Sequence, residues 1–242
     1  MKLLSLNIEG TRHLDKVFDF LDSEKADIIC LQESPLSISS ELRRRGYTTT
    51  TVPLTVKIQN GFNFTEGSIF ATLNYHRPDV HYYHRPQERV AVFDINRTRE
   101  TVAQALIFAE LGDIHIATTH FTWVPDGRVA SDEQVEDMKN MLDLLDTKPP
   151  HILCGDLNIP RNINRLYEDE ILPRYTDAVP DEYKSSLDRS LHRLGNDPEK
   201  LDLFESFMVD HLLLMKPFLA EDVRLEFGLS DHAAIVANVK KS

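Results

Sequence analysis

Polar side chains follow short apolar runs at five places along the chain. The runs are LLSLN at 3–7, DIICLQE at 27–33, IHIATTH at 114–120, ILCGDLN at 152–158 and LSDH at 229–232. A short apolar run bounded by polar residues is typical of a buried strand. Carboxylate, amide and imidazole groups recur at these strand ends from the first ten residues to the last dozen. The pattern therefore predicts that the sheets bring these groups together at one metal-dependent hydrolytic site.

A strand, helix, strand unit is predicted at the start of the chain. The apolar residues of 14–21 fall at i, i+3, i+4 and i+7, which indicates a helix with one apolar face. Thr11 is the expected N-cap of this helix. Residues 27–33 follow as a continuous apolar run, which suits a strand that is buried on both faces.

A second helix is predicted after Ser131. Ser131 and Gln134 have the spacing of a capping box. The apolar residues behind this pair keep helical spacing, and they are Val135, Met138, Leu142 and Leu145. Pro149 and Pro150 are expected to end the helix, because proline cannot continue the hydrogen-bond ladder.

Strands without intervening helices are predicted in the middle of the chain. β-Branched and aromatic residues, separated by polar turns, mark the segments 67–73, 89–96, 102–111 and 113–119. Such a meander implies antiparallel pairing. Together with a last strand at 233–239, the order of elements fits two sheets packed face to face with helices outside.

Length and composition favour one domain over residues 1–242. Hydrophobic residues make up 41% of the chain, and no low-complexity linker or repeat interrupts it. Cys30 and Cys154 lie within apolar runs, where a small buried hydrophobe is the expected role. The first apolar run is too short for a signal peptide, and no stretch approaches the roughly 20 apolar residues of a membrane span. A cytoplasmic location without a membrane partner is therefore expected.

The charge of the chain limits the classes of partner. The formal net charge is -12, from 27 basic and 39 acidic residues, so the chain lacks the broad positive field of a protein that coats nucleic acid. A nuclease is still allowed, because an acidic site that binds Mg²⁺ reverses its own local charge. Basic clusters such as 43–45 and 184–193 are typical of a solvated mixed surface.

Six short motifs resemble, in their order, those of the endonuclease/exonuclease/phosphatase superfamily. They are N-x-E-G at 7–10, L-Q-E at 31–33, T-H-F at 119–121, G-D-L-N at 155–158, V-D-H at 209–211 and S-D-H at 230–232. Each motif alone is common, but six in the expected order across the whole chain make a chance match improbable. The resemblance implies an α/β fold, a four-layered α/β sandwich with two mixed sheets packed face to face and helices outside. It also implies a metal-dependent phosphoric ester hydrolase.

The resemblance further implies a Mg²⁺ site, for which Mn²⁺ is an expected substitute. Mg²⁺ takes oxygen ligands and keeps several waters, so one or two carboxylates beside the substrate phosphate are enough. Glu33 is the first expected ligand. The resemblance adds Asp231, acting directly or through water, and places Asn7 beside the metal. Glu9 is either a further member of this group or a surface charge.

An oriented water is the second requirement of phosphoester hydrolysis. By resemblance, Asp156 positions or deprotonates this water. Asn158 lies two residues on and would project to the same side of an extended chain, where it would orient Asp156 and contact the phosphate. A turn-forming Asp-x-Asn at a strand exit is the alternative.

Two histidines are expected to contact the phosphoryl group. His232 would meet a non-bridging oxygen, with Asp210 behind it to fix the tautomer. His120 would bind phosphate or protonate the leaving oxygen, unless it is only a hydrogen-bonded histidine at a strand end. His211 is left out of the site, because it points to the opposite face from Asp210 in an extended strand.

Substrate choice is expected to lie in two loops. Trp123 either stacks on a base or sugar or covers the core beneath its loop, and the sequence does not separate these roles. Arg189, with His192 and Arg193 beside it, is a candidate contact to phosphate.

The leading hypothesis is a Mg²⁺-dependent phosphodiesterase that cleaves a P–O bond by in-line attack of water. Its phosphoester substrate is expected to be a nucleic acid or nucleotide-like. The same scaffold serves phosphomonoesterases on inositol phosphates or nucleotides, and phospholipid head-group hydrolases, so these classes stay open. A non-catalytic interaction protein is disfavoured, because the metal carboxylate, the Asp-x-Asn pair and the S-D-H triplet are intact. No protein partner is inferred.

Overall fold

Two six-stranded mixed sheets form the centre of the molecule, whose computed structural model describes residues 1–59, 61–74, 76–85 and 90–242. In order across sheet A, the strands are β11 (Phe218–Glu226), β12 (Ala234–Lys241), β1 (Lys2–Asn7), β2 (Ile28–Pro35), β4 (Phe62–Thr72) and β3 (Thr48–Gln59). Across sheet B they are β5 (Asp79–His84), β6 (Gln104–Leu111), β7 (Ile114–Thr119), β8 (Ile152–Asp156), β10 (Asp210–Leu214) and β9 (Thr176–Asp177).

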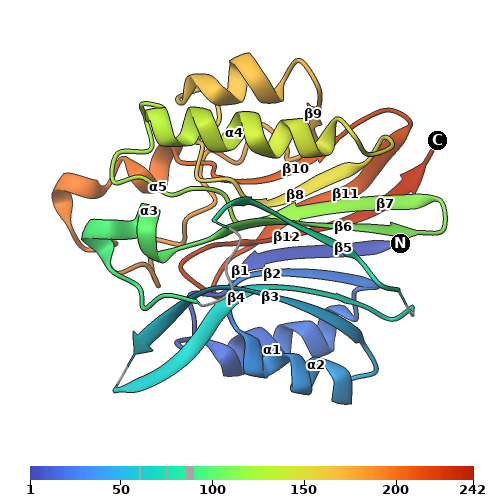
Figure 1. Ribbon diagram of the computed structural model, residues 1–242, viewed down its shortest axis with the longest axis horizontal. Coiled ribbons are helices and arrows are strands. Elements are labelled where there is room, and N and C mark those ends of the chain that lie inside the picture. The colour runs from blue at the N-terminus through green and yellow to red at the C-terminus, as the bar shows by residue number, and fades with distance from the viewer. Residues whose placement is uncertain (60, 75, 86–89) are drawn as a thin grey trace.

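Helices cover the outer faces of both sheets (Figure 1). Below sheet A in that view lie α1 (Leu14–Glu24) and α2 (Ser39–Arg44), and above sheet B lies α4 (Asp132–Leu145). Two short helices, α3 (Thr98–Thr101) and α5 (Leu203–Ser206), lie beyond one end of the sheets. A π-helical turn spans Tyr167–Ile171, and 3-10 turns span Leu36–Ile38, Ile95–Arg97 and Pro198–Lys200. The four-layered α/β sandwich expected from the sequence is confirmed.

Three apolar clusters hold the four layers together. One fills the space between the sheets, one joins sheet A to α1 and α2, and one joins sheet B to α4. Cys30 and Cys154 belong to the central cluster as free, buried thiols. Burial raises the pKa of the Cys30 thiol, and the neighbouring thiol of Cys154 adds to this effect. The cysteines therefore act as small buried hydrophobes, as expected.

The predicted helices are present, but one predicted cap is wrong. Helix α1 begins at Leu14, and His13 precedes it without a side-chain hydrogen bond. Thr11 instead donates from its backbone N–H to Gln59 Oε1 at 3.0 Å. At α4 the predicted cap is confirmed, because Ser131 Oγ accepts from the backbone N–H of Gln134 at 3.1 Å.

The predicted meander is only partly correct. The segments 67–73, 102–111 and 113–119 correspond to β4, β6 and β7, and β6 pairs antiparallel with β7. The last strand, β12, is also confirmed. No strand occupies 90–96, the described part of the segment 89–96, and residue 89 lies outside the described residues. Val92 makes an isolated bridge to Val56 there, and Ile95–Arg97 forms a 3-10 turn.

The strand directions gather polar residues at one end of the sandwich. Strands β1 and β2 run parallel in sheet A, and β7 and β8 run parallel in sheet B. Strands β12 and β10 run antiparallel to β1 and β8, so each begins where its neighbour ends. Asp231 and His232 lie in the connection from β11 to β12 and adjoin the start of β12, whereas the sequence placed them directly at the end of a strand. Among the described residues, no helix is long and apolar enough to span a bilayer.

Gly155 is required where β7 and β8 approach this end. Its φ is +136°, and a Cβ atom there would lie 2.1 Å from the backbone oxygen of Thr119. We expect Gly155→Ala to lower the free energy of unfolding by about 3 kcal/mol or more, because strain and a backbone clash add. Urea denaturation measures this loss.

Gly112→Ala is the matched control, since Gly112 also has a positive φ but a Cβ atom there would meet no neighbouring atom within 4 Å. Only backbone strain applies there, so the expected loss is about 1 kcal/mol. Equal losses in the two variants would contradict the close approach of the strands at Gly155.

Candidate active site

A cavity of about 610 Å³ opens at the end of the sandwich where the polar residues gather. Most of the residues singled out from the sequence line it, namely Glu9, Glu33, His120, Trp123, Asp156, Asn158, Asp231 and His232. Asn7 and Asp210 are almost fully buried and lie behind this wall. Both sheets therefore contribute to one site.

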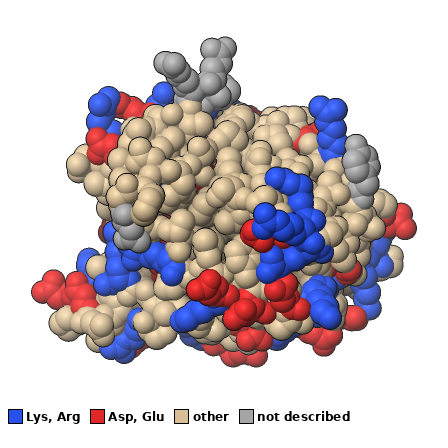
Figure 2. Space-filling view, turned by 90° about the horizontal axis from the view of Figure 1, so that it is seen from below, with Lys and Arg blue, Asp and Glu red and all other residues tan. Residues whose placement is uncertain are grey.

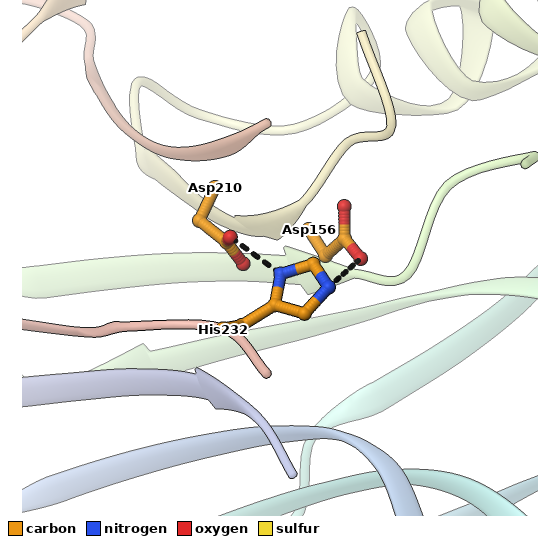
Figure 3. A group of neighbouring side chains, drawn as sticks. All are labelled: Asp156, Asp210 and His232. Atoms are coloured by element: carbon orange, nitrogen blue, oxygen red, sulfur yellow. Dashed lines mark hydrogen bonds and ion pairs between the residues drawn. The ribbon is translucent and has the colours of Figure 1, made fainter. Parts of the chain in front are cut away.

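Asp156, Asp210 and His232 form a buried group (Figure 3). Asp210 pairs with Asp156 in the register of β10 and β8. His232 Nδ1 lies 2.7 Å from Asp210 Oδ2, and its Nε2 lies 3.9 Å from Asp156 Oδ2. Burial opposes a charge on the imidazole, but the two carboxylates outweigh burial and raise the pKa of His232 well above its usual value. His232 is therefore a charged hydrogen-bond donor.

Asp156 is held by donors from both sheets. Asn7 Nδ2 donates to its Oδ2 at 3.0 Å, and the backbone N–H of Asn158 donates to its Oδ1 at 2.9 Å. Burial raises the pKa of Asp156 above its usual value, although His232 acts in the opposite direction. A fixed carboxylate with raised basicity suits a group that accepts a proton from water.

Asn158 does not lie on extended backbone, so its expected side-chain contact with Asp156 is wrong. Its φ is 51°, and its Nδ2 donates to the backbone oxygen of Phe121 at 2.9 Å. The turn after β8 thus lets the backbone of Asn158 orient Asp156 while its side chain fixes the loop after β7.

His120 lies between the two halves of the site. Its Nε2 is 3.6 Å from Asp156 Oδ2 and 3.8 Å from Glu33 Oε1. The side chain is only 14% exposed, and it lines the cavity. His120 is therefore placed to contact a group bound between Glu33 and Asp156.

Glu33 is positioned by a bulge in β2. Its φ is 47°, and the register of β2 with β4 shifts between Leu31 and Ser34. Asn7 Nδ2 lies 3.3 Å from Glu33 Oε1, and Lys57 Nζ lies 3.7 Å from its Oε2. Burial raises the pKa of Glu33, but the nearby charges of Lys57 and His120 outweigh it and lower the pKa to about 2. The Glu33 carboxylate is therefore ionised.

Glu9 lies near the carboxylates of Asp231 and Glu33, so the alternative that it is a plain surface charge is not supported. Burial and the neighbouring carboxylate of Asp231 raise the pKa of Glu9 to about 7. Glu9 Oε1 lies 3.2 Å from Arg12 Nη1. Its Oε2 is buried and lacks a hydrogen-bond partner among the described residues, although His13 Nε2 is 3.3 Å away.

Lys57 and Glu66 also line this part of the cavity, and sequence reasoning missed both. Lys57 Nζ lies 3.3 Å from Glu66 Oε1, and burial and Glu33 raise the pKa of Glu66 to about 8. These residues come from β3 and β4, whose pairing through a long hairpin leaves no motif in the sequence.

The loop residues divide into one that reaches the cavity and one that does not. Trp123 is 37% exposed and lines the cavity. Arg189 is outside the lining, and its Nε donates to the backbone oxygen of Gly195 at 3.0 Å. The phosphate contact of Arg189 stays a prediction, whereas its neighbours His192 and Arg193 do line the cavity.

His211 lies away from the site, as expected. Its Nδ1 is 3.1 Å from Asp177 Oδ2 and its Nε2 is 3.1 Å from the backbone oxygen of Ile159. Tyr167 packs against the ring. The residue therefore belongs to a buried structural network on the other face of β10.

Comparisons with known proteins identify the family. The sequence profile of the Endonuclease/Exonuclease/phosphatase family matches residues 4–232, so the chain belongs to this family. No curated protein sequence matches the chain significantly. An endonuclease/exonuclease/phosphatase from Beutenbergia cavernae has a similar structure, with 17% identity, a TM-score of 0.71, and coverage of 100% of this chain and 72% of that one.

Two further solved structures show the same fold. The human Nocturnin catalytic domain with bound sulfate is 16% identical, with a TM-score of 0.70 and coverage of 100% and 93% of the two chains. A mannosyl-6-phosphatase from Bacteroides thetaiotaomicron is 13% identical, with a TM-score of 0.66 and coverage of 99% of each chain. The family and the buried Asp156, Asp210 and His232 group define the chain as a phosphoester hydrolase.

Proposed function

We propose that the protein is a Mg²⁺-dependent phosphodiesterase that hydrolyses a P–O bond of a nucleotide-like or nucleic acid substrate by in-line attack of water. The observation that carries this proposal is the position of His120 between Glu33 and Asp156. Glu9, Glu33 and Asp231, from sheet A, form an acidic half of the site. The fixed carboxylate of Asp156 faces this half, together with the imidazoles of His120 and His232. This arrangement supplies a cation site, a base and donors for phosphoryl oxygens.

The acidic half fits a hard divalent cation. Glu9, Glu33 and Asp231 offer carboxylate oxygens, with the Asn7 amide beside them. The buried Oε2 of Glu9 accepts no hydrogen bond from the described residues, and a bound cation would satisfy such an acceptor. Mg²⁺, or Mn²⁺ in its place, would supply neutralisation of charge on the phosphoryl oxygens.

The group of Asp156, Asp210 and His232 is a second place where an ion could be sought, since its ligand atoms lie within 4.8 Å of one another. His232 Nδ1 is already hydrogen-bonded to Asp210, and a protonated imidazole has no lone pair for a metal. We therefore assign this group to proton transfer and phosphate contact, and the cation to the acidic half.

The residues around Asp156 are assigned the remaining steps. Asp156 accepts a proton from the attacking water, while Asn7 and the Asn158 backbone hold its carboxylate in place. His232, supported by Asp210, donates to a non-bridging oxygen. His120 donates a proton to the leaving oxygen.

Hydrolysis of a generic phosphodiester, with and without chelator, tests the proposal. We expect Mg²⁺-dependent turnover that chelation abolishes and that added Mg²⁺ or Mn²⁺ restores. The same measurement on single-stranded and double-stranded DNA, RNA, nucleotide monoesters and inositol phosphates separates the substrate classes. Activity that persists in chelator would exclude the proposed chemistry.

His120→Asn tests the assignment of the leaving-group acid. We expect a loss of roughly 10²- to 10³-fold in kcat for esters of alkyl alcohols, because a general acid contributes on that scale. For 4-nitrophenyl esters the loss should be much smaller, since nitrophenolate leaves without a proton. His115→Asn, outside the cavity lining, is the control. Equal losses on both kinds of ester would refute an acid role for His120.

A phosphomonoesterase is the second candidate, and the size of the cavity favours it. A volume of about 610 Å³ lies within the usual range for small-molecule sites, roughly 300–1,000 Å³. On the face that carries α1 and α2, basic and acidic side chains lie next to one another (Figure 2). A net charge of -12 likewise gives no general attraction for a polyanion.

A further inference from the structure

A lysine ammonium lies beside the carboxylate to which we assign the cation. Lys57 Nζ is 3.7 Å from Glu33 Oε2 and 3.3 Å from Glu66 Oε1. The three residues line the cavity and come from β3, β2 and β4, which lie side by side at one edge of sheet A (Figure 1). None of the proposed catalytic steps involves Lys57, so its position beside Glu33 needs a separate explanation.

The Lys57 side chain is held in this position by its neighbours on sheet A. The antiparallel register of β3 with β4 makes Lys57 and Glu66 diagonal neighbours on one face of the sheet. The ammonium also lies 4.2 Å from the centre of the Phe93 ring, which is a cation–π contact. Only 26% of the side chain is exposed. The ammonium is therefore a fixed charge beside Glu33 rather than a mobile group in solvent.

Lys57 keeps its positive charge at neutral pH. Burial lowers the pKa of Lys57, but the carboxylates of Glu33 and Glu66 outweigh burial and raise it. The opposite charge of Glu33 is thus already balanced on one side before any metal ion binds. A permanent charge of this kind has the same sign as the metal and acts at the same carboxylate.

The two oxygens of the Glu33 carboxylate have different neighbours. Oε1 lies 3.3 Å from Asn7 Nδ2 and 3.8 Å from His120 Nε2. Asn7 and His120 both also approach Asp156, so Oε1 is on the side of the proposed base. Oε2 is on the side of Lys57. A second divalent ion that shared the Glu33 carboxylate, as in sites with two metals, would meet the ammonium on the Oε2 side.

We propose that Lys57 is a positioning residue that takes the place of a second cation beside Glu33, so that the acidic half of the site binds a single divalent ion. This inference rests on the proposed function, because it needs the cation at Glu33. It also has a sign. A unit positive charge about 6 Å from a divalent ion opposes its binding by roughly 10-fold even at the dielectric constant of water. Lys57 should therefore weaken the binding of the one ion that Glu33 holds.

Isothermal titration calorimetry of the full chain with Mn²⁺, without substrate, tests this inference. We expect the unaltered protein to bind one Mn²⁺. Lys57→Met keeps an apolar stem against the Phe93 ring but removes the charge, so it should bind its first Mn²⁺ about 10-fold more tightly. Lys57→Arg keeps the charge and should stay within about 3-fold of the unaltered protein. Lys57→Gln removes the same charge and gives the same test if Lys57→Met does not fold.

Lys139→Met is the matched control for the loss of one positive charge. Lys139 is 73% exposed on α4 and lies outside the cavity lining, so its replacement should leave Mn²⁺ affinity unchanged. Two Mn²⁺ ions bound by the unaltered protein would overturn the inference. So would weaker or equal binding in Lys57→Met, which a merely structural role of Lys57 predicts, or an equal gain in Lys139→Met.

Failure of the proposed function is seen separately, as absence of Mg²⁺-dependent turnover of a generic phosphodiester by the unaltered protein. If only the inference about Lys57 fails, that turnover persists. The two failures are therefore distinguishable on the same preparation of protein.

Discussion

Replacement of Asp156 by Asn is expected to lower kcat by roughly 10⁴-fold, the upper end of the effect of a general base. Asparagine keeps the shape of the side chain and its acceptor for the Asn158 backbone N–H, but it does not accept a proton from water. Single-turnover hydrolysis of a generic phosphodiester at saturating Mg²⁺ measures this loss. The substrate Kd should stay nearly the same, because the substitution removes a group that acts in the transition state.

The raised pKa of Asp156 also sets how the stability of the protein depends on pH in chelator. Burial raises the pKa of Asp156, so the folded state holds this proton more tightly than the unfolded state does. Stability from this group is therefore lost as pH rises through its pKa, and the ionised carboxylate is a cost at neutral pH.

Asp177→Asn is the matched control, since its nearly buried carboxylate on the same sheet accepts from His211 and Tyr167. It should lower stability but leave kcat within a few-fold. A kcat of Asp156→Asn near that of the unaltered enzyme would contradict the role of Asp156.

Replacement of Glu33 by Gln is expected to lower kcat/KM by roughly 10³-fold or more and to raise the Mg²⁺ concentration needed for half-maximal activity. The Glu33 carboxylate is ionised, as its lowered pKa of about 2 indicates, so Gln removes a full negative charge from the cation site. Mg²⁺ activation curves and Mn²⁺ titration calorimetry separate weaker metal binding from slower chemistry.

Glu66→Gln is the control for this prediction. Glu66 contacts the same Lys57, and its pKa of about 8 means that Gln resembles its neutral form at pH 7. Mg²⁺ activation should therefore change little in Glu66→Gln. If the two variants shift the Mg²⁺ requirement equally, the cation does not depend on Glu33 in particular.

The layers of the fold and the location of the site could be predicted because they depend on local patterns. Apolar runs predicted the buried strands, and the polar residues at their ends predicted Asn7, Glu33 and Asp156 as neighbours. Asn7 does bond to both carboxylates, although 26 and 149 residues separate it from them. Local periodicity likewise predicted α4 and its Ser131 cap.

The side chains whose placement differs from the prediction, or that the sequence did not indicate, depend on backbone turns and on pairing between distant segments. The Asn158 side chain bonds to Phe121 rather than to Asp156 because its φ is positive, which a side-chain pattern does not reveal. Arg189 bonds within its own loop, which has no periodicity to interpret. Lys57 and Gln104 reach the cavity only through the registers of β3 with β4 and β5 with β6, and a register has no signature in single residues.

Glu33 and Asp156 stand on opposite sides of the active site, and they belong to different sheets. Glu33 lies in sheet A and Asp156 ends a strand of sheet B, and Cys30 and Cys154 precede them on facing strands within the apolar layer. Among the described residues the two sheets share no ladder, so the thickness of that layer, about 10 Å, sets how far Glu33 lies from Asp156. We therefore expect a methylene removed from this layer to change the rate of turnover, because it changes the separation of Glu33 and Asp156.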